Sequence, residues 1–599
     1  MKKIILYSSL LLVIGIGSCS KILDRVDING VSNQVVWNDE GVATLYLNNL
    51  YNLVMPVWPL DESAATLPTP IHNISDDANG TSNNSGNILN GTLTVDQVTD
   101  FYTGASGAYA KIRNINIMLT NIDTGSLAVE VKDKLKAQAY FLRAFVYFQL
   151  VKIYGGVPYI TSPQDWLTDS LLVTRNKTSE CVDLMLADLD HCSVLPGAWT
   201  AAADYGRITR GAALALKGKI LLYWASPQFN PGNDASRWER AYQVNRHAYD
   251  TLTLDGYALY PTFSRIFIDA YKTTDKEPIL FRSYNGTTVS GLYNNYDAYT
   301  RPYSQSSTAG GKTNNPTWNL VQAFPMKDGK AITDLTSTYV YDTLRYWRNR
   351  DPRFYATIVY NGAVYGLGTT SGRKQWTYTG ITDDKSSPTT TGFYARKNID
   401  TAVTALNVVN GKTAWVEMRL AEVMLNLAEC ANATNRQSEA YDMMVAIRKR
   451  AGIDAGGGQY GLAASMTTAD MATAILNERR VEFAFEGKRY DDLRRTRTFD
   501  LLNGSFRNQL AIAPKSPYTV ATLEKALPGG GKARDTINIE DTAQLNKYFK
   551  FQVIPITSEL AINFLSNYYI YGIPTTNITK DPNMRQTMGW GAGDFDATK

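Results

Sequence analysis

The segment that most constrains the fold of this chain covers residues 137–153 and reads AQAYFLRAFVYFQLVKI. Its strongly polar residues are Gln138, Arg143, Gln149 and Lys152. A helix that is apolar on nearly every side must be packed by neighbours on most of its faces. The following Gly155-Gly156-Val157-Pro158 is expected to end it, because glycine frees the backbone and proline blocks continuation. The segment therefore predicts a helix buried within a larger helical assembly.

A second helix is predicted over residues 211–225, where small side chains line one face. That stripe consists of Gly211, Ala215, Gly218, Leu222 and Ala225. Because small residues leave room for a neighbouring backbone, we expect another helix to pack closely along this face. The residue before a proline disfavours helical geometry, so Ser226-Pro227 is expected to end the helix.

A third helical pattern begins at Val416 and is followed, after a short polar turn, by a fourth. The apolar stripes are Val416, Leu420, Val423, Met424, Leu427 and Ala431 in the first, and Ala440, Met443, Met444 and Ile447 in the second. The spacing predicts two antiparallel helices joined as a hairpin. Such pairs are similar to tetratricopeptide units, although the chain shows no clean repeat of about 34 residues.

Two irregular stretches, residues 66–90 and 284–315, separate the helical patterns. The first is rich in Pro, Asn, Ser, Asp and Gly, and the second in Gly, Ser, Asn and Tyr. Residues 356–360, followed by Asn361-Gly362, have the character of a strand and a turn. Long irregular stretches inside a compact protein are more often functional than accidental, which directs the search for a site to these loops.

The N-terminus has the features of an export signal. Lys2 and Lys3 precede an apolar stretch, 4–16, that is too short to span a bilayer, which needs roughly 20 apolar residues. The stretch ends in Gly17-Ser18-Cys19, where small residues precede a cysteine as in a bacterial lipobox. We expect residues 1–18 to be removed and Cys19 to be acylated, which would attach the chain stably to a membrane. The alternative is an ordinary cleavage site with an incidental cysteine nearby.

The composition suits uncharged polar ligands better than nucleic acid. Charged residues make up 19% of the chain, which contains 37 tyrosines and has a formal net charge of +4 over 599 residues. Nucleic-acid binding would require clustered basic residues, so it is not expected. The histidines, His72, His191 and His247, are too scattered to suggest a zinc site. No cofactor is expected, and a calcium site of backbone and carboxylate oxygens stays open.

Cys181, Cys192 and Cys430 remain once Cys19 is set aside. The first two lie on one predicted helix, where eleven residues span about 16 Å, too far for a disulfide. Buried free thiols are therefore expected.

The acidic residues Glu478, Glu482 and Glu486 follow one another at helical-turn spacing. Two carboxylates about 5 to 5.5 Å apart are the signature of a retaining glycosidase. However, productive carboxylates face each other across a cleft, and six cations are interleaved with these acids: Arg479, Arg480, Lys488, Arg489, Arg494 and Arg495. Ion pairs explain the pattern better. The chain also lacks the sequence motifs of serine hydrolases, P-loop enzymes and zinc proteases, so no catalytic residue is assigned.

The best candidates for ligand contact are aromatic and polar residues of the later loop. A sugar ring stacks its C–H face on an aromatic plane while its hydroxyls need amide or carboxylate partners. The candidates there are Tyr284, Tyr293, Asn294, Tyr296, Asp297, Tyr299, Tyr303 and Trp318. The alternative is that these side chains only staple the loop or contact another protein.

The earlier loop offers a second set of candidates for the same cleft or for a cation. They are Trp58, Asn73 and Asp76, accompanied by Asp77, Asn79, Asn83 and Asn84.

Five blocks of the sequence, in order, resemble the SusD/RagB group, the surface lipoproteins of nutrient uptake in Bacteroidetes. They are LRA to YGGVP (142–158), GRITRGAALALKGK (206–219) with Ala225-Ser226-Pro227, AFPMKDG (323–329) with NRDPRF (349–354), RLAEV (419–423) with IRKRAGI (447–453), and ERRVEFAFEGKRYDDLRR (478–495). With the lipobox and a closing segment at 581–590, the likeness spans nearly the whole chain. Each block alone is weak evidence, but the ordered set is specific.

The resemblance implies a mainly α fold in which tetratricopeptide-like helix pairs support an irregular, loop-rich, ligand-facing half with few short strands. It implies a helical region over 19–230, a loop-rich region over 231–410 and a second helical region over 411–599. It also implies a non-enzymatic lipoprotein on the outer membrane that captures oligosaccharides for a SusC-type TonB-dependent transporter.

Two departures from the family pattern caution against carrying over ligand details. Pro316-Thr317 is followed by Trp318 where the family usually has glutamine, and residues 586–590 read QTMGW where Gln-Asn-Pro-Gly-aromatic is common. Two alternatives therefore stay open: a RagB-like peptide binder, and a lid or scaffold of the transporter that binds no ligand itself.

Overall fold

The structure is a computed structural model. It describes residues 33–58, 71–80, 86–98, 107–165, 167–270, 272, 274–287, 292–306, 310–311, 313–368, 370–557 and 559–599. The predicted leader, Cys19, Asn83 and Asn84 lie outside these ranges. Within them, no helix combines the length and the apolar character that crossing a bilayer would require.

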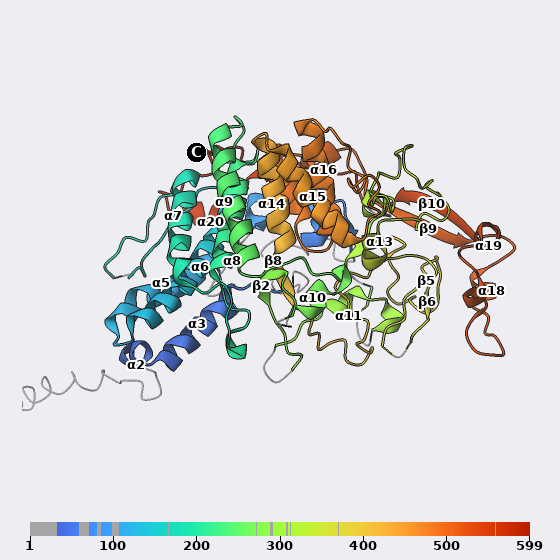
Figure 1. Cartoon of the computed structure of the whole chain (residues 1–599), viewed down its shortest axis with the longest axis horizontal. Coiled ribbons are helices and arrows are strands. Elements are labelled where there is room, and N and C mark those ends of the chain that lie inside the picture. The colour runs from blue at the N-terminus through green and yellow to red at the C-terminus, as the bar shows by residue number, and fades with distance from the viewer. Residues whose placement is uncertain are drawn as a thin grey trace, which may run out of the picture.

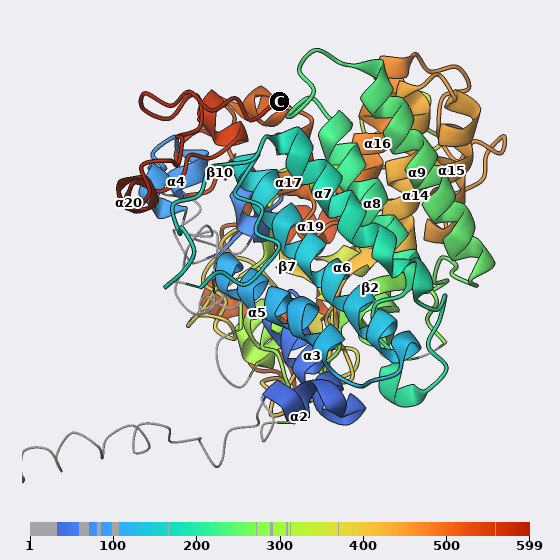
Figure 2. The ribbon, with the colours of Figure 1, turned by 90° about the vertical axis from the view of Figure 1, so that its left-hand side faces the viewer.

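Long helices from both ends of the chain lie side by side and form one half of the molecule (Figures 1 and 2). The N-terminal ones are α2 (Asn33–Asn38), α3 (Glu40–Val54), α5 (Ala108–Asn121), α6 (Val129–Tyr154), α7 (Thr178–Asp190), α8 (Arg210–Ala225) and α9 (Ala235–Leu254). The C-terminal ones are α14 (Leu420–Ala433), α15 (Gln437–Ala451), α16 (Thr468–Glu482) and α17 (Arg489–Arg495). The predicted mainly α fold is confirmed.

The predicted central helix is confirmed as α6, which is longer than its apolar segment. Most of its residues from Leu135 to Tyr154 are buried, and even its Arg143 is enclosed and paired with Asp188 at 2.6 Å. Gly155 ends the helix with a positive φ of 73°, a conformation that glycine adopts without strain.

The corner that follows α6 is covered by the last residues of the chain. The Thr178 hydroxyl donates to the Ala597 carbonyl at 2.7 Å, and the Arg175 guanidinium lies 3.6 Å from the centre of the Phe595 ring. A side chain at Gly155 would collide with Ala597. The C-terminal residues of the chain are therefore packed against the corner that follows α6.

The small-residue stripe of α8 faces α9, as predicted. A β-carbon at Gly211 would lie 2.6 Å from Leu252, and one at Gly218 would overlap the amide of Asn245. Asn245 is fully buried and donates to the Gly218 carbonyl at 3.0 Å. The two helices thus approach each other closely at both glycines.

Replacing Gly218 with valine is expected to lower the free energy of unfolding by about 1–3 kcal/mol, because the new side chain must displace a buried, hydrogen-bonded amide. Urea denaturation would measure the change. Gly232→Val is the control, since a β-carbon there has no neighbour within 4 Å. Equal stability of the two variants would show that the contact between α8 and α9 is looser than described.

The predicted helical hairpin is confirmed as α14 and α15, but its start was wrong. Val416 lies in strand β8 (Trp415–Arg419), which pairs antiparallel with β2 (Pro278–Arg282) and places Val416 opposite Phe281. The helix begins only at Leu420. The apolar run there carries strand and helix in succession, and both are buried, so the apolar positions alone did not mark the boundary.

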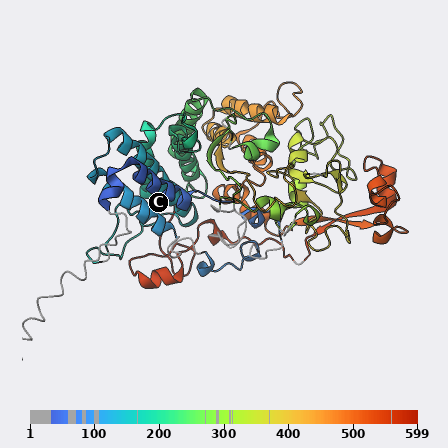
Figure 3. The same cartoon turned by 90° about the horizontal axis from the view of Figure 1, so that it is seen from below.

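The other half of the molecule is built from loops, short helices and strands (Figure 3). Its short helices are α10 (Ile266–Asp269), α11 (Tyr296–Thr300), α12 (Trp318–Ala323) and α13 (Pro352–Thr357). Further short helices are α4 (Gly86–Leu89), α18 (Val520–Leu523), α19 (Thr542–Tyr548) and α20 (Thr575–Lys580). The division of the chain at residues 230 and 410 stays a prediction.

All strands of the described residues form antiparallel two-stranded sheets. Besides β2 and β8, the pairs are β1 (Ala78–Asn79) with β3 (Asn315–Pro316), β4 (Ile358–Val359) with β7 (Tyr394–Ala395), β5 (Ala363–Val364) with β6 (Lys374–Gln375), and β9 (Asn508–Pro514) with β10 (Phe549–Pro555). The predicted strand at 356–360 is thus realised as β4, and its turn follows at Gly362. The β9–β10 hairpin extends away from the helices (Figure 1).

The acidic residues of α16 and the segment after it form buried ion pairs, as expected. Glu478 pairs with Arg353 and Arg448, Glu486 with Lys397 and Arg419, and Glu482 with Arg353, Arg419 and Arg450. The partners come from the loop-rich half, β8 and α15, so the network joins the two halves of the molecule.

The three cysteines of the described chain are confirmed as free and buried.

Candidate ligand-binding site

Two of the predicted aromatic residues stack on each other inside the protein. The rings of Trp58 and Tyr296 lie 4.0 Å apart and nearly parallel. Trp58 donates its indole N–H to the Thr413 carbonyl at 2.9 Å, and the Tyr296 hydroxyl donates to the Lys397 carbonyl at 3.1 Å. Tyr284 belongs to the same buried cluster. These side chains hold the loops together in this structure.

The polar candidates of the later loop are also engaged within the protein. Asn294 is buried and donates to the carbonyls of Gly411 and Thr413 at 3.1 and 3.0 Å. Asp297 is buried and pairs with the enclosed Arg301 at 2.9 Å. Burial raises the pKa of Asp297 to about 6 although Arg301 opposes the rise.

The remaining buried candidates lie in other places. Trp318 packs edge-on against Tyr346, with ring centres 5.1 Å apart. Asp76 is buried and pairs with Arg480 and Arg489; burial would raise its pKa, but the two guanidinium groups lower it below the ordinary range. Asn73 is fully buried, and neither atom of its amide has a hydrogen-bond partner.

Three predicted residues offer surface to a ligand. Tyr293 is exposed, and Tyr299 and Tyr303 are half-buried. For these three, ligand contact stays a prediction. For the buried candidates, the contacts described above are accounted for by the alternative that these side chains hold the loops together.

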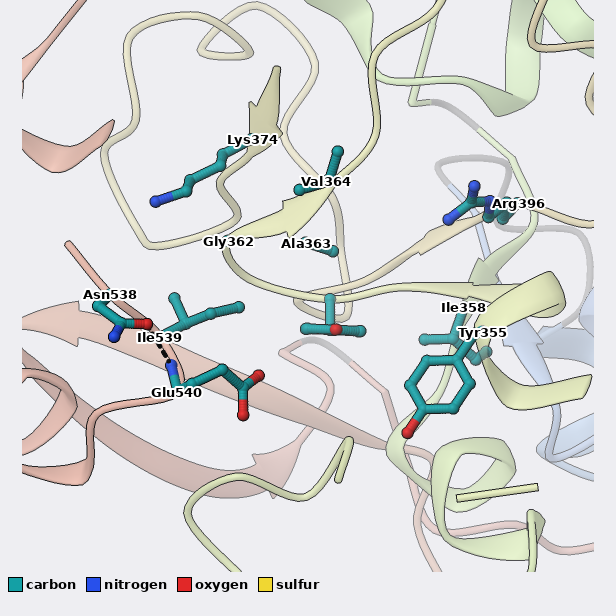
Figure 4. A pocket seen from close by; sticks show the side chains of 11 residues that line it. Tyr355, Ile358, Gly362, Ala363, Val364, Lys374, Arg396, Asn538, Ile539 and Glu540 are labelled. Atoms are coloured by element: carbon teal, nitrogen blue, oxygen red, sulfur yellow. Dashed lines mark hydrogen bonds between the residues drawn. The ribbon is translucent and has the colours of Figure 1, made fainter. Parts of the chain in front are cut away.

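A cavity of about 330 Å³ opens in the loop-rich half, between the strands β4 to β6 and a C-terminal segment (Figure 4). It is lined by Tyr355, Ile358, Tyr360, Gly362, Ala363, Val364, Lys374, Arg396, Asn538, Ile539 and Glu540. Its volume is at the lower end of the roughly 300–1,000 Å³ typical of small-molecule sites. None of these residues was among the predicted candidates.

The Asn361-Gly362 turn lets two distant parts of the chain meet at this cavity. Gly362 has a positive φ of 81°, and a β-carbon there would lie 2.6 Å from the Ile539 side chain. Glycine is therefore required both by the backbone conformation and by the close approach. The turn brings segment 538–540 against β4 and β5.

Two tyrosines supply the aromatic part of the lining. Tyr360 stacks on Trp347 with ring centres 4.9 Å apart, and the Trp347 indole donates to the Glu540 carboxylate at 2.9 Å. Tyr355 is 36% exposed, and its hydroxyl donates to the Trp347 carbonyl. Trp347 thus fixes the positions of both rings and of Glu540.

The polar groups of the lining come from opposite sides. Figure 4 places Arg396 and Tyr355 on one side, and Lys374, Asn538 and Glu540 on the other. Burial raises the pKa of Tyr360, with Tyr355 and Glu540 adding to the rise and Arg396 opposing it, so its phenol stays protonated. The cavity therefore combines aromatic faces with hydrogen-bond donors and acceptors, which suits the binding of a polar ring compound.

The lining differs from the active site of a glycosidase. Glu540 is the single carboxylate among the lining residues, whereas glycoside hydrolysis uses a facing pair. Among the described residues, no group of three or more His, Cys, Asp and Glu side chains is arranged to hold a metal ion.

The sequence carried little signal for this site. The pattern at 356–362 predicts a strand and a turn, but Tyr360 is separated from Asn538 and Glu540 by almost 180 positions of mixed sequence. No periodicity links two such segments.

Comparison with known proteins points to one family throughout the chain. A model of the SusD family matches residues 276–590, and a model described as starch-binding associating with outer membrane matches residues 46–222. "SusD-like protein P2" of Formosa agariphila is 24% identical over 397 residues, which cover 65% of this chain and 70% of that protein.

Solved structures share the fold. A SusD-like carbohydrate binding protein from Bacteroides fragilis superposes with a TM-score of 0.70 at 23% identity, covering 92% of this chain and 99% of its own. A laminarin binding SusD-like protein gives a TM-score of 0.60 at 20% identity, covering 92% and 100%.

Proposed function

This chain belongs to the SusD family, and from that premise we propose that it is a cell-surface lipoprotein that captures oligosaccharides for import through a SusC-type TonB-dependent outer-membrane transporter. The observation that supports ligand capture most directly is the cavity lined by Tyr355 and Tyr360. Two structural relatives are named as binders of carbohydrate and of laminarin. The proposed role is binding, without catalysis.

The lipobox-like segment supports the proposed location. Acylation of Cys19 would hold the protein on the outer membrane, facing the exterior, beside its transporter. Tethering raises the effective concentration of one partner around the other, so that even weak ligand capture can serve uptake.

Tyr355 tests the proposal, because its ring is exposed in the cavity while its hydroxyl serves the fold. Tyr355→Ala is expected to weaken glycan binding about tenfold or more, since it removes the stacking face. Tyr355→Phe keeps that face and is the matched control. Calorimetry with the purified protein across a panel of glycans would measure both affinities, and thermal unfolding would show that both variants are folded.

Two outcomes would contradict the proposal. Absence of binding to every glycan would remove its basis, and peptides that co-purify with the native protein would favour the peptide-binding alternative. Equal glycan affinities for the wild type and Tyr355→Ala would show that the site lies elsewhere, and the exposed Tyr293 would be the next residue to substitute.

A further inference from the structure

We propose that the ligand of this cavity carries a negative charge, and that Arg396 recognises it as the carboxylate or sulfate of an acidic saccharide. The inference rests on the proposed function and narrows it to a class of glycan. It is carried by the charges around the cavity.

Arg396 is the arginine of the loop-rich region whose guanidinium has no hydrogen bond or ion pair within the described chain. The guanidinium lies near the ring of Tyr365, 5.6 Å from the ring centre. Its backbone is fixed, because its N–H donates to the Thr357 carbonyl at 2.8 Å. The position is therefore well defined while the five N–H donors of the guanidinium have no acceptor among the described residues.

Other arginines of the loop-rich region have ion-pair or hydrogen-bond partners within the protein. Arg345 pairs with Asp342, Arg353 with three carboxylates, and Arg373 with Asp383. Arg350 faces no carboxylate but donates to backbone carbonyls, including that of Tyr346 at 2.7 Å. A half-buried guanidinium without any such partner is thus an exception in this region, and it lies at the cavity.

Lys374 adds a second positive charge without a countercharge. Its ammonium group donates to the backbone carbonyls of Asp535 and Ile537, at 3.0 and 2.8 Å. The carboxylate of Asp535 itself accepts from the Trp376 indole at 2.9 Å and forms no ion pair with Lys374. Backbone carbonyls satisfy the donors of Lys374 but leave its charge in place.

The one lining carboxylate does not neutralise these two cations. Glu540 accepts from the Trp347 indole and lies 3.5 Å from the guanidinium of Arg348. With that pair formed, Lys374 and Arg396 remain without an ion-pair partner among the described residues. An anionic ligand would supply the missing countercharge.

Guanidinium chemistry favours an oxyanion that is part of a sugar. A planar guanidinium binds carboxylate or sulfate through two parallel hydrogen bonds and is weakly hydrated, so it gives up water readily. Tyr355 lies on the same side of the cavity as Arg396 (Figure 4). A uronate or sulfated sugar can therefore place its ring on the tyrosine and its charge against the arginine.

The test uses the full-length protein in detergent and two pairs of glycans that differ only in charge. The pairs are oligogalacturonate with its methyl ester, and dextran sulfate with dextran. We expect the charged member of at least one pair to bind tenfold or more tighter, and the advantage to shrink as salt is raised. The two pairs distinguish carboxylate from sulfate.

Arg396→Gln is expected to abolish this preference while leaving the affinity for the uncharged glycans within about twofold. Arg396→Lys keeps the charge but not the paired hydrogen bonds, and an intermediate preference is expected. Arg585→Gln is the control, because it removes one exposed arginine on the C-terminal segment, where Arg585 pairs with Asp594. If Arg396→Gln does not fold, two measurements still test the role of Arg396. They are the salt dependence of glycan binding by the wild type and the preference of Arg396→Lys for charged glycans.

The outcomes separate this inference from the proposed function. Uncharged glycans that bind as tightly as charged ones would overturn the inference and leave glycan capture standing. A preference for charged glycans that survives Arg396→Gln, or that Arg585→Gln removes equally, would overturn the role of Arg396. Failure of every glycan to bind would overturn both.

Discussion

Replacing Glu482 with glutamine is expected to lower the free energy of unfolding by about 3–5 kcal/mol, enough to leave a marginally stable protein partly unfolded. Glu482 is fully buried and accepts from Arg353 at 2.8 Å, from Arg419 at 2.7 Å and from Arg450. Burial would raise its pKa, but these three guanidinium groups hold it well below its ordinary value. Without the carboxylate, three buried cations would share fewer countercharges.

Urea denaturation of the wild type and of Glu482→Gln would measure the loss. Glu130→Gln is the matched control, because Glu130 is exposed and pairs one helical turn away with Lys134 at 2.7 Å. Exposed pairs of that kind contribute little to stability, because water and salt screen them. An equally small effect at Glu482 would show that the buried network adjusts to the lost charge and does not hold the two halves of the molecule together.

Replacing Cys19 with serine is expected to release nearly all of the protein from the outer membrane. Acyl chains on Cys19 would supply the attachment, because two or more acyl chains hold a protein stably on a bilayer. Metabolic labelling with a radioactive fatty acid would measure the loss of acylation. Fractionation of cells would measure the release of the protein from the membrane. Uptake through the partner transporter should fall in parallel, because the tether is lost.

Cys430→Ala is the control for this experiment. Cys430 is a buried free thiol in α14, so its loss should leave the label and the membrane fraction unchanged. A Cys19→Ser protein that remains in the membrane fraction would contradict the predicted anchor and favour the alternative of an ordinary cleavage site.

The helical half of the fold could be predicted because its signals are local. The mostly apolar segment at 137–153, the small-residue stripe from Gly211 and the hairpin after Leu420 each follow from spacing within one element. Val416 was misplaced because strand β8 continues into α14 without a break in apolar character. Apolar periodicity identifies buried faces more securely than it identifies boundaries.

The candidate site could not be predicted in the same way. Trp58 and Tyr296 were chosen from loop-like, polar sequence, yet they stack in a buried cluster across more than 200 positions. The cavity residues join Tyr355 and Tyr360 to Glu540 through Trp347, a contact that depends on the tertiary fold alone. In an irregular region, a residue can contact a ligand only if the fold leaves it accessible.

The contact between the corner after α6 and the C-terminal residues bears on the order in which the chain would fold during the proposed export. The bond from Thr178 to Ala597 joins residues 419 positions apart, so the surface of the N-terminal helices is completed only by chain that is synthesised much later. Closing so long a loop is slow, because the entropy is lost before the contacts form. We therefore expect folding to finish only after the whole chain has passed the inner membrane, which would keep the polypeptide in a form that the export channel accepts.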